Sequence, residues 1–560
     1  EDILGDQSIE FAKLNLRAGE RSIEASDFMS ALTYLQYGIS FLPEEKGWET
    51  NYELSLRLYE SACLACYTDS RLGMMFGILE EIFENAKCFE DKLNGYFVLV
   101  QSMISSGKLK ESIDRVFFIL GELGESFPES DVSPATIQAA LISTKISLDG
   151  YSKENWISAP RLNNKRKHWA VRLMAHIFPY IFVLKPMHIP LLACRIINIS
   201  TKHGVCSESA AGFAWYAYCQ MNFLRDIDSA VRWGKIALAL VESLASMIDD
   251  QKSKNLVPKL KILCYHMIFC WVEPLQSISI ALLQGHREAL LVGENESAMF
   301  GATFYCKHSI ICGNPLPVVE EECTALALKM RQLNRLPTFS VHLANLRSVL
   351  RLVGSKKNPF EDLGEDELLR HALSSGWLTT VHAIYSNRLF ISFFFKHFEK
   401  AKEAAECADQ YKSEQTMTIS RNNCHVFYKG LTAFHFARCP TEELSKQKWM
   451  EIGENALLFF RTWVNHSKWN WENKLLLLEA EWHFSRGEKE EAETKYTIAL
   501  ESARQHRFVH EEGLTNELCA AFHTTNGNVN KARSHNSEAR VCYEKWGAFA
   551  LVHLLDTSGK

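Results

Sequence analysis

The chain has 560 residues, of which 47% are hydrophobic and 23% charged, and one compact core rarely grows to that size. Several domains or an open-ended stack are therefore expected. The 61 basic and 67 acidic residues give a net charge of −6, which argues against a protein that coats nucleic acid.

Cysteine usage and hydropathy point to a cytoplasmic protein. The 16 cysteines have no spacing framework and many lie among apolar residues, as expected for reduced core thiols. No signal peptide is visible, and because the sequence begins with Glu1 we expect it to be part of a longer chain. The most apolar stretch, residues 175–199, is interrupted by three prolines and Lys185. It predicts two buried helices that meet at a turn rather than a segment inserted in a membrane.

One pattern recurs along the chain. It consists of a turn residue, an apolar residue two positions later, a small residue at five, and packing positions at nine and twelve. The first copy is Ser26, Phe28, Ala31, Leu35 and Gly38. The six copies have turn residues Ser26, Gly107, Arg225, Lys396, Gly487 and Gly527, and small residues Ala31, Ser112, Ala230, Ala401, Ala492 and Ala532.

The spacing of the copies is typical of helical-hairpin repeats. The small residues are separated by 81, 118, 171, 91 and 40 positions, which are near multiples of about 40. Gly19 and Pro43 stand twelve residues before and after Ala31, as in a tetratricopeptide unit. Alternating apolar and polar runs are scarce, which disfavours strands. The sequence therefore predicts an all-α fold, an α-solenoid of tetratricopeptide-like hairpins wound into a right-handed superhelix.

Three stretches interrupt this rhythm. Residues 124–136 and 157–169 are loop-like, and the third stretch is residues 353–367. The third combines glycine, proline and mixed charge, and it predicts a boundary between an N-terminal array over residues 1–355 and a C-terminal array over 356–560. One continuous solenoid is the alternative.

Two cysteine motifs could carry chemistry. Cys63 and Cys66 have the C-x-x-C spacing of a zinc site, but no second pair follows, so core packing is the preferred interpretation. His308 and Cys312, four residues apart on a helix, can touch and could form a nucleophile with its base. With no third orienting group evident, a structural histidine is preferred and an all-α enzyme stays the alternative.

His506 and His510, followed by Glu511 and Glu512, have a metal-capable spacing. They lack the H-E-x-x-H arrangement, so a solvated helix face is preferred. No metal and no cofactor is assigned to any residue.

Tryptophans and a basic run are the candidate partner-binding residues. Lys165, Arg166, Lys167 and Trp169 form a short basic segment with an aromatic residue that could grip an acidic partner. Trp463, Trp469 and Trp471 cannot share one helical stripe, so at least one should be partly exposed.

Residues 540–556 predict one further helix that is apolar most of the way round. Trp546 is its predicted anchor for a downstream domain or a partner helix. Packing of this helix on the preceding hairpin is the equally weighted alternative.

Several segments resemble a known family, in the family's order and over nearly the whole chain. They begin "ALTYLQYGISFLPEEKGWETNYELSLRLYESACLACY" (31–67), continue through "AAGFAWYAYCQMNFLRDIDSAVRWGKIALAL" (210–240) and include "NKLLLLEAEWHFSRGEKEEAETKYTIAL" (473–500). The chain resembles the region after the ATPase domain in large signalling proteins built from a serine/threonine kinase, an AAA-type ATPase, a tetratricopeptide-like part, a GAF domain and a histidine kinase. The resemblance implies a non-catalytic relay between ATPase and output domains.

The sequence lacks the motifs of the catalytic domains themselves. It contains no G-x-x-x-x-G-K-[ST] phosphate loop and no H-R-D and D-F-G set. We therefore expect no enzymatic activity in this segment. The predicted function is protein–protein or interdomain contact and signal relay, with protein partners and no nucleic acid. A free-standing tetratricopeptide adaptor is a further alternative.

Overall fold

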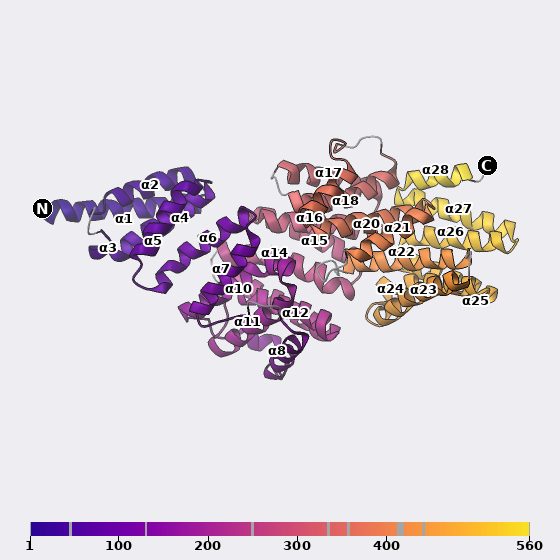
Figure 1. Cartoon of the computed structure of the whole chain (residues 1–560), viewed down its shortest axis with the longest axis horizontal. Coiled ribbons are helices and arrows are strands. Elements are labelled where there is room, and N and C mark those ends of the chain that lie inside the picture. The colour runs from indigo at the N-terminus through magenta and orange to yellow at the C-terminus, as the bar shows by residue number, and fades with distance from the viewer. Residues whose placement is uncertain are drawn as a thin grey trace. The chain divides into compact units, whose positions relative to one another are not determined.

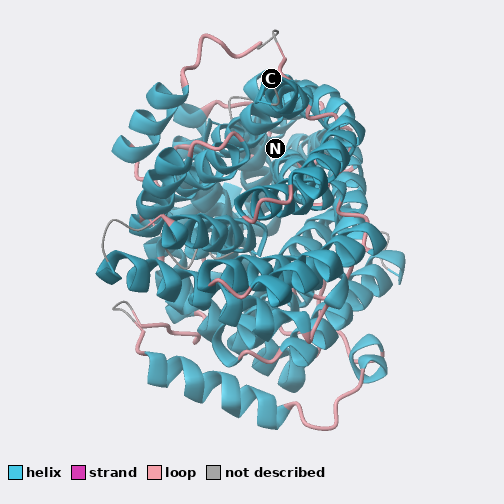
Figure 2. Cartoon of the chain, turned by 90° about the vertical axis from the view of Figure 1, so that its right-hand side faces the viewer, coloured by secondary structure: helices cyan, strands magenta, loops and turns pink. Residues whose placement is uncertain are grey.

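The computed structural model describes residues 2–43, 47–128, 132–247, 251–332, 336–355, 359–411, 419–439 and 443–558. Within these ranges the chain forms consecutive helices and no strand, and one isolated bridge joins Arg161 to Val205 (Figure 2). The predicted all-α fold is confirmed.

The chain divides into two compact units, residues 1–149 with 159–212, and residues 150–158 with 213–560. The first unit contains α1 (Asp2–Glu24), α2 (Phe28–Ser40), α3 (Gly47–Thr50), α4 (Tyr52–Thr68), α5 (Leu72–Asn85), η1 (Phe89–Lys92), α6 (Leu93–Ser105), α7 (Leu109–Glu122), α8 (Pro134–Ser147), α10 (Lys165–Leu184), η2 (Pro186–His188) and α11 (Ile189–His203). The boundary between the units falls within α12 (Ser209–Leu224).

The second unit, which also takes in α9 (Lys153–Ile157), is a longer run of hairpins (Figure 1). Its further helices are α13 (Ile227–Met247), α14 (Gln251–Met267), η3 (Phe269–Trp271), α15 (Leu275–Leu291), α16 (Asn295–Ile311), α17 (Leu316–Gln332), α18 (Leu336–Val353), α19 (Glu365–Ser374), α20 (Leu378–Phe394), α21 (Phe398–Gln410), α22 (Ile419–Arg438), α23 (Glu443–Val464), α24 (Lys468–Arg486), α25 (Lys489–Gln505), α26 (Val509–Thr525), α27 (Val529–Trp546) and α28 (Phe549–Ser558).

The recurring sequence pattern marks the turns between helices. All six predicted turn residues have positive φ, from 56° at Arg225 to 78° at Gly487. The six small residues that follow them are all buried. A left-handed residue ends one helix and frees the chain to start the next, and a small residue lets the two helices approach closely. The predicted array of helical hairpins is confirmed, and the handedness of its superhelix stays a prediction.

The structure adds turns that the sequence search missed. Arg507 and Gly547 also have positive φ, and with Gly487 and Gly527 they follow one another at intervals of 20 residues. Two helices with their turns therefore make one unit of 40 residues. Arg507 and Gly547 went unrecognised because Glu512 and Val552, rather than small residues, stand five positions after them.

Helices of the second unit alternate between two environments. In α16, thirteen of the 17 residues are buried, whereas in α25 only five of 17 are. The helices α16, α18, α20, α22, α24 and α26 pack against one another in succession, and each helix that follows one of them packs against it, except α19, which packs against α20. We call these six the inner helices. Because they are buried around most of their circumference, their polar residues must find partners inside the protein.

Three predictions about the elements are corrected. The boundary predicted at 353–367 lies inside the second unit, where α18 packs against α20 across it. Residues 165–169 are not a loop, because Asn164 caps α10 by accepting a hydrogen bond from the backbone of Lys167. The helix predicted over 540–556 is two helices, separated at Gly547 in a left-handed conformation with φ of 84°.

Candidate functional site

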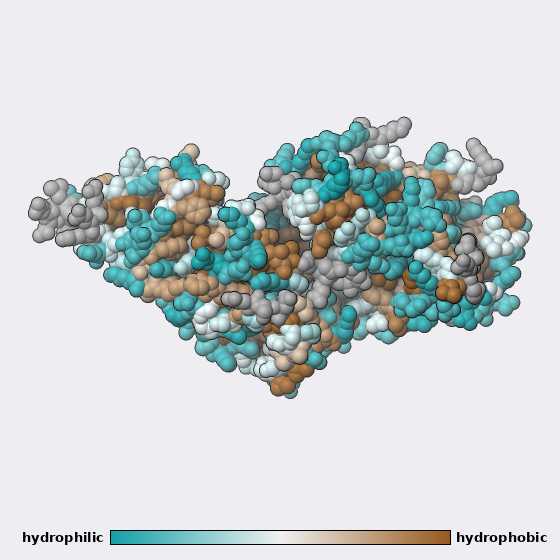
Figure 3. Space-filling view, in the orientation of Figure 1, coloured by the Kyte–Doolittle hydropathy of each residue, from teal (hydrophilic) through white to brown (hydrophobic). Residues whose placement is uncertain are grey.

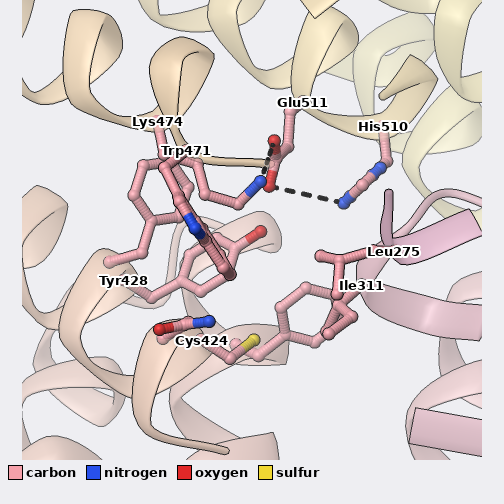
Figure 4. A pocket seen from close by; sticks show the side chains of 11 residues that line it. Leu275, Ile311, Cys424, Tyr428, Trp471, Lys474, His510 and Glu511 are labelled. Carbon is pink, nitrogen blue, oxygen red and sulfur yellow. Dashed lines mark hydrogen bonds and ion pairs between the residues drawn. The ribbon is translucent and has the colours of Figure 1, made fainter. Parts of the chain in front are cut away.

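A cluster of polar side chains lies buried between inner helices α24 and α26. Its members are Asn470, Asn473 and Lys474 of α24 and His510 and Glu511 of α26; we call it the polar cluster. The Lys474 ammonium lies 2.8 Å from Glu511 Oε2 and donates to the carbonyl of Asn470 at 3.0 Å. Figure 4 shows the Lys474 side chain pointing at the Glu511 carboxylate. Asn473 donates to the same carboxylate.

Burial sets the electrostatics of the polar cluster. It raises the pKa of Glu511, although Lys474 and Asn473 stabilise the charged form of this carboxyl. Burial, and then the charge of Lys474, hold the pKa of His510 well below its ordinary value. The ammonium also stands 4.0 Å from the centroid of the Phe508 ring, a favourable cation–π contact. The Lys474–Glu511 ion pair is therefore shielded from water, and its charges are stabilised by the neighbouring protein groups.

A cavity of about 20 Å³ adjoins the polar cluster. Besides Lys474, His510 and Glu511, it is lined by Leu275, Ile311, Phe390, Asn423, Cys424, Phe427, Tyr428 and Trp471. It has room for about one water molecule, whereas small-molecule sites measure about 300–1,000 Å³. In this conformation the cavity cannot hold a substrate.

The sequence interpretation of His506 to Glu512 is wrong. A solvated helix face was preferred, yet His506, His510 and Glu511 are all buried. His506 and His510 do not share a helix either, because Arg507 turns the chain between α25 and α26. These three side chains are part of the protein interior.

His308 and Cys312, the alternative catalytic pair, lie fully buried at the end of α16. His308 Nε2 is 3.2 Å from His266 Nδ1, and the Cys312 thiol donates to the carbonyl of Ser309. Burial raises the pKa of Cys312 to about 12 and, followed by the charge of Lys307, lowers the pKa of His308 to about 3. A nucleophilic cysteine needs the opposite shifts, so this geometry does not favour catalysis.

The low pKa of His308 predicts a stability that depends on pH. Below pH of about 6.5 the unfolded histidine binds a proton that the folded protein excludes, so the free energy of unfolding falls as pH drops from about 6.5 towards 3. One such proton contributes about 1.4 kcal/mol per pH unit. We expect His308→Gln to remove this contribution from urea unfolding measured between pH 6 and pH 4. Exposed His553→Gln should leave the slope of unfolding free energy against pH unchanged. Equal slopes for the native chain and His308→Gln would show that His308 does not cause the pH dependence.

The remaining candidates take structural positions. Cys63 and Cys66 are buried in α4, where burial raises the pKa of their thiols to about 12 and 11. Trp463 and Trp471 are buried, whereas Trp469 is partly exposed and donates to Gln276, as the spacing of the three tryptophans predicted.

The basic segment of α10 is largely engaged within the first unit. Arg166 pairs with Glu90, and Lys167 lies 2.5 Å from Glu125. Trp169 is buried against Phe97. Binding of a partner by Lys165, Arg166, Lys167 and Trp169 stays a prediction.

Trp546 is a core residue rather than an exposed anchor. Its side chain is 0% exposed and packs against the rings of Phe394 and His510, with centroids 5.7 and 5.1 Å away. The helix α27 thus packs on earlier hairpins, which is the alternative that the sequence left open. The left-handed turn at Gly547 directs the apolar residues that follow into a separate helix, α28.

Three sets of side chains in the described residues bring metal-binding atoms within 4.8 Å of one another. They are Cys306, Cys323 and His342; Cys519, His523 and His535; and His168, Cys206 and Glu208. Sequence reasoning found none of them, because each set joins residues of different helices or of a helix and a loop. The spacing of Cys519 and His523, four residues apart, was the one available local signal.

Comparison with known proteins identifies no family for this chain. No family model and no curated protein matches the chain. A solved chain described as a "circular tandem repeat protein with novel repeat topology and enhanced subunit contact surfaces" aligns over 100% of both chains, with 11% identity and a TM-score of 0.16. At that score no argument rests on it. Among the described residues, no helix is both long and apolar enough to cross a membrane.

Proposed function

We propose that this chain is a non-catalytic helical-repeat region that mediates protein–protein or interdomain contacts and relays conformational change through its second unit. The observation that carries the proposal is a set of hydrogen bonds that join the start of α15 to the start of α24 and to the end of α25. We call it the Asn470 clasp, and it consists of Leu275, Gln276, Trp469, Asn470 and His506.

The clasp joins segments that are 195 residues apart in sequence. Asn470 accepts from the backbone N–H of Leu275 at 3.0 Å and donates to the carbonyl of Glu273 at 2.7 Å. Gln276 donates to the carbonyl of His506 at 3.1 Å and accepts from the Trp469 indole at 3.0 Å. In a simple stacked array each hairpin contacts only its neighbours. Here distant hairpins are tied directly, so a change of packing at one can alter the other.

The polar cluster supports the same mechanism. Asn470 belongs to both features, because its side chain binds the start of α15 and its carbonyl accepts from Lys474. Buried hydrogen bonds have discrete partners, so the inner helices can exchange between arrangements but cannot slide continuously. A contact that favours one packing arrangement at one end of the second unit would therefore shift the inner helices toward that arrangement.

Exposed side chains support protein as the partner class. The α1–α5 region of the first unit presents large apolar side chains, and Figure 3 shows tan and brown surface there. They are Phe11, Leu14, Met29, Tyr34, Tyr37, Leu64, Leu72, Met74 and Phe76. Aromatic residues and methionine are enriched at protein interfaces. The pairing of Arg166 and Lys167 with acidic residues weakens the case for nucleic acid.

The relay is tested with Asn470→Ala. This change leaves the N–H of Leu275 and the carbonyl of Glu273 without their partner, which costs about 1–3 kcal/mol for buried groups. We expect faster amide hydrogen exchange at the start of both α15 and α24, with the α1–α2 hairpin unchanged.

Asn526→Ala is the matched control, because Asn526 bonds only locally to the carbonyl of Phe522. It should leave α15 unaffected. Faster amide exchange confined to α24 in Asn470→Ala would show that the clasp does not couple α24 to α15. That outcome would remove the basis of the proposed relay.

The wider context, a kinase and AAA-type ATPase signalling protein, rests on the sequence resemblance. Reading the coding sequence on both sides of residues 1–560 tests it. An upstream G-x-x-x-x-G-K-[ST] loop is the expected finding, and an upstream region without any ATPase motif contradicts the assignment.

A further inference from the structure

The hairpin of α26 and α27 brings a cysteine and two histidines together near its surface. Cys519 and His523 lie four residues apart on α26, and His535 lies on α27. One sulfur and one nitrogen from each imidazole all lie within 4.8 Å of one another. Cys519 and His523 are buried and His535 is partly exposed, so the group has a side open to solvent.

The two imidazoles already have the separation that a shared metal ion requires. Their centroids are 5.4 Å apart, with 14° between the ring planes. Two histidines that bind one tetrahedral zinc ion at about 2.0–2.1 Å per nitrogen hold their centroids about 5 Å apart. Because the two rings are nearly parallel, side-chain rotations would have to turn one nitrogen of each ring toward the shared ion.

Hydrogen bonds orient His535 as in many metal sites. His535 Nδ1 lies 2.8 Å from the Asn516 side-chain oxygen, and the amide of Asn516 donates to the carbonyl of Glu512 at 3.1 Å. This chain places the Asn516 oxygen, an acceptor, against Nδ1 and leaves the lone pair of His535 on Nε2. A histidine ligand commonly donates its other ring N–H to an oxygen in this way.

His523 has a ring nitrogen that is available to bind a metal ion. Its side chain is 1% exposed, and its Nδ1 has no hydrogen-bond partner among the described residues. A buried polar atom without a partner is costly, and a functional site is one explanation for it. Glu493 of α25 stands 3.9 Å from His523 Nε2, and the same carboxylate oxygen lies 2.5 Å from the Lys531 ammonium.

We propose that Cys519, His523 and His535 bind a divalent transition metal of the zinc class, with water from the solvent-exposed side as the fourth ligand. Thiolate and imidazole ligands suit zinc, and four-coordinate sites of this kind are common. Binding replaces the thiol proton of Cys519, which is released to solvent, by a sulfur–metal bond. The metal would crosslink α26 to α27.

The other two sets of metal-binding side chains are weaker candidates. Cys306, Cys323 and His342 are all deeply buried, and no carboxylate completes that set. The third set offers one imidazole beside its thiol and carboxylate. Among the three sets found in the described residues, only the α26–α27 group combines two imidazoles and a thiol with access from solvent.

Cobalt titration of the full chain tests the site, because Co²⁺ takes zinc positions and a cobalt–thiolate bond gives a charge-transfer absorption band. We expect one equivalent of Co²⁺ to produce this band and Zn²⁺ to displace it. Cys519→Ser should abolish the band, and His535→Ala should weaken cobalt binding at least tenfold. Cys542→Ser is the matched control, since Cys542 is equally buried on α27 but outside the group.

Circular dichroism of each variant will establish that it remains folded. The proposal is overturned if folded native chain binds no stoichiometric cobalt, or if the band survives in both Cys519→Ser and His535→Ala. A band that is lost only in Cys306→Ser would assign the metal to the other buried set and would equally overturn it.

Discussion

Lys474→Ala should destabilise the second unit by about 3–5 kcal/mol, the range measured when one member of a buried ion pair is removed. The change leaves the Glu511 carboxylate buried without its cation, and it removes the hydrogen bond to the carbonyl of Asn470. Urea unfolding, followed by tryptophan fluorescence and circular dichroism, gives the loss of unfolding free energy.

Two variants make this measurement decisive. Lys495→Ala removes a cation 2.7 Å from Glu479 on a more exposed part of the surface, where pairs contribute about 0–1 kcal/mol. The double change Lys474→Met with Glu511→Leu should recover much of the stability, because it leaves no buried charge. Equal losses for Lys474→Ala and Lys495→Ala would show that the polar cluster is not sequestered from water.

Ala492→Arg should unfold α24–α27 while leaving distant hairpins folded. Ala492 is 0% exposed in α25, so a long charged side chain there disrupts packing and buries an unpaired charge. Through the Asn470 clasp the loss of protection should extend to the start of α15, but it should not reach α1 and α2. Amide hydrogen exchange, resolved by peptide, provides the measurement.

Thr497→Arg provides the control on the same helix, since Thr497 is exposed. Its exchange pattern should match that of the native chain. Uniform loss of protection across the described residues in Ala492→Arg would contradict the array, because it would mean that the whole chain unfolds as one cooperative unit.

The helical periodicity of the sequence was enough to predict the hairpins. A stripe such as Ala492, Tyr496 and Ala499 is local, and all three residues are buried as predicted. The turn at Arg507 escaped because the pattern requires a small residue five positions later, and Glu512 stands there. Local pattern therefore reveals helices better than it reveals the turns between them.

The polar cluster could not be read from the sequence for a different reason. Polar residues on a helix are expected to face solvent, and Glu511 and Lys474 are 37 residues apart. Only the burial of the inner helices on several sides turns these side chains inward. Similarly, the sequence left open whether Trp546 is an anchor for a partner or packs on the preceding hairpin, because the left-handed turn at Gly547, which separates it from α28, was not foreseen.

The Asn470 clasp also bears on the order in which the chain folds. Hairpins such as α24–α25 form from residues close in sequence, which favours fast folding. Closing a loop of 195 residues costs about 2 kcal/mol more entropy than closing one of about 20 residues. The intervening hairpins shorten that loop once they have formed. The clasp therefore belongs to the last steps of folding, and during synthesis it can form only after α24 has emerged from the ribosome, so that α15 must wait for a partner encoded 195 residues later.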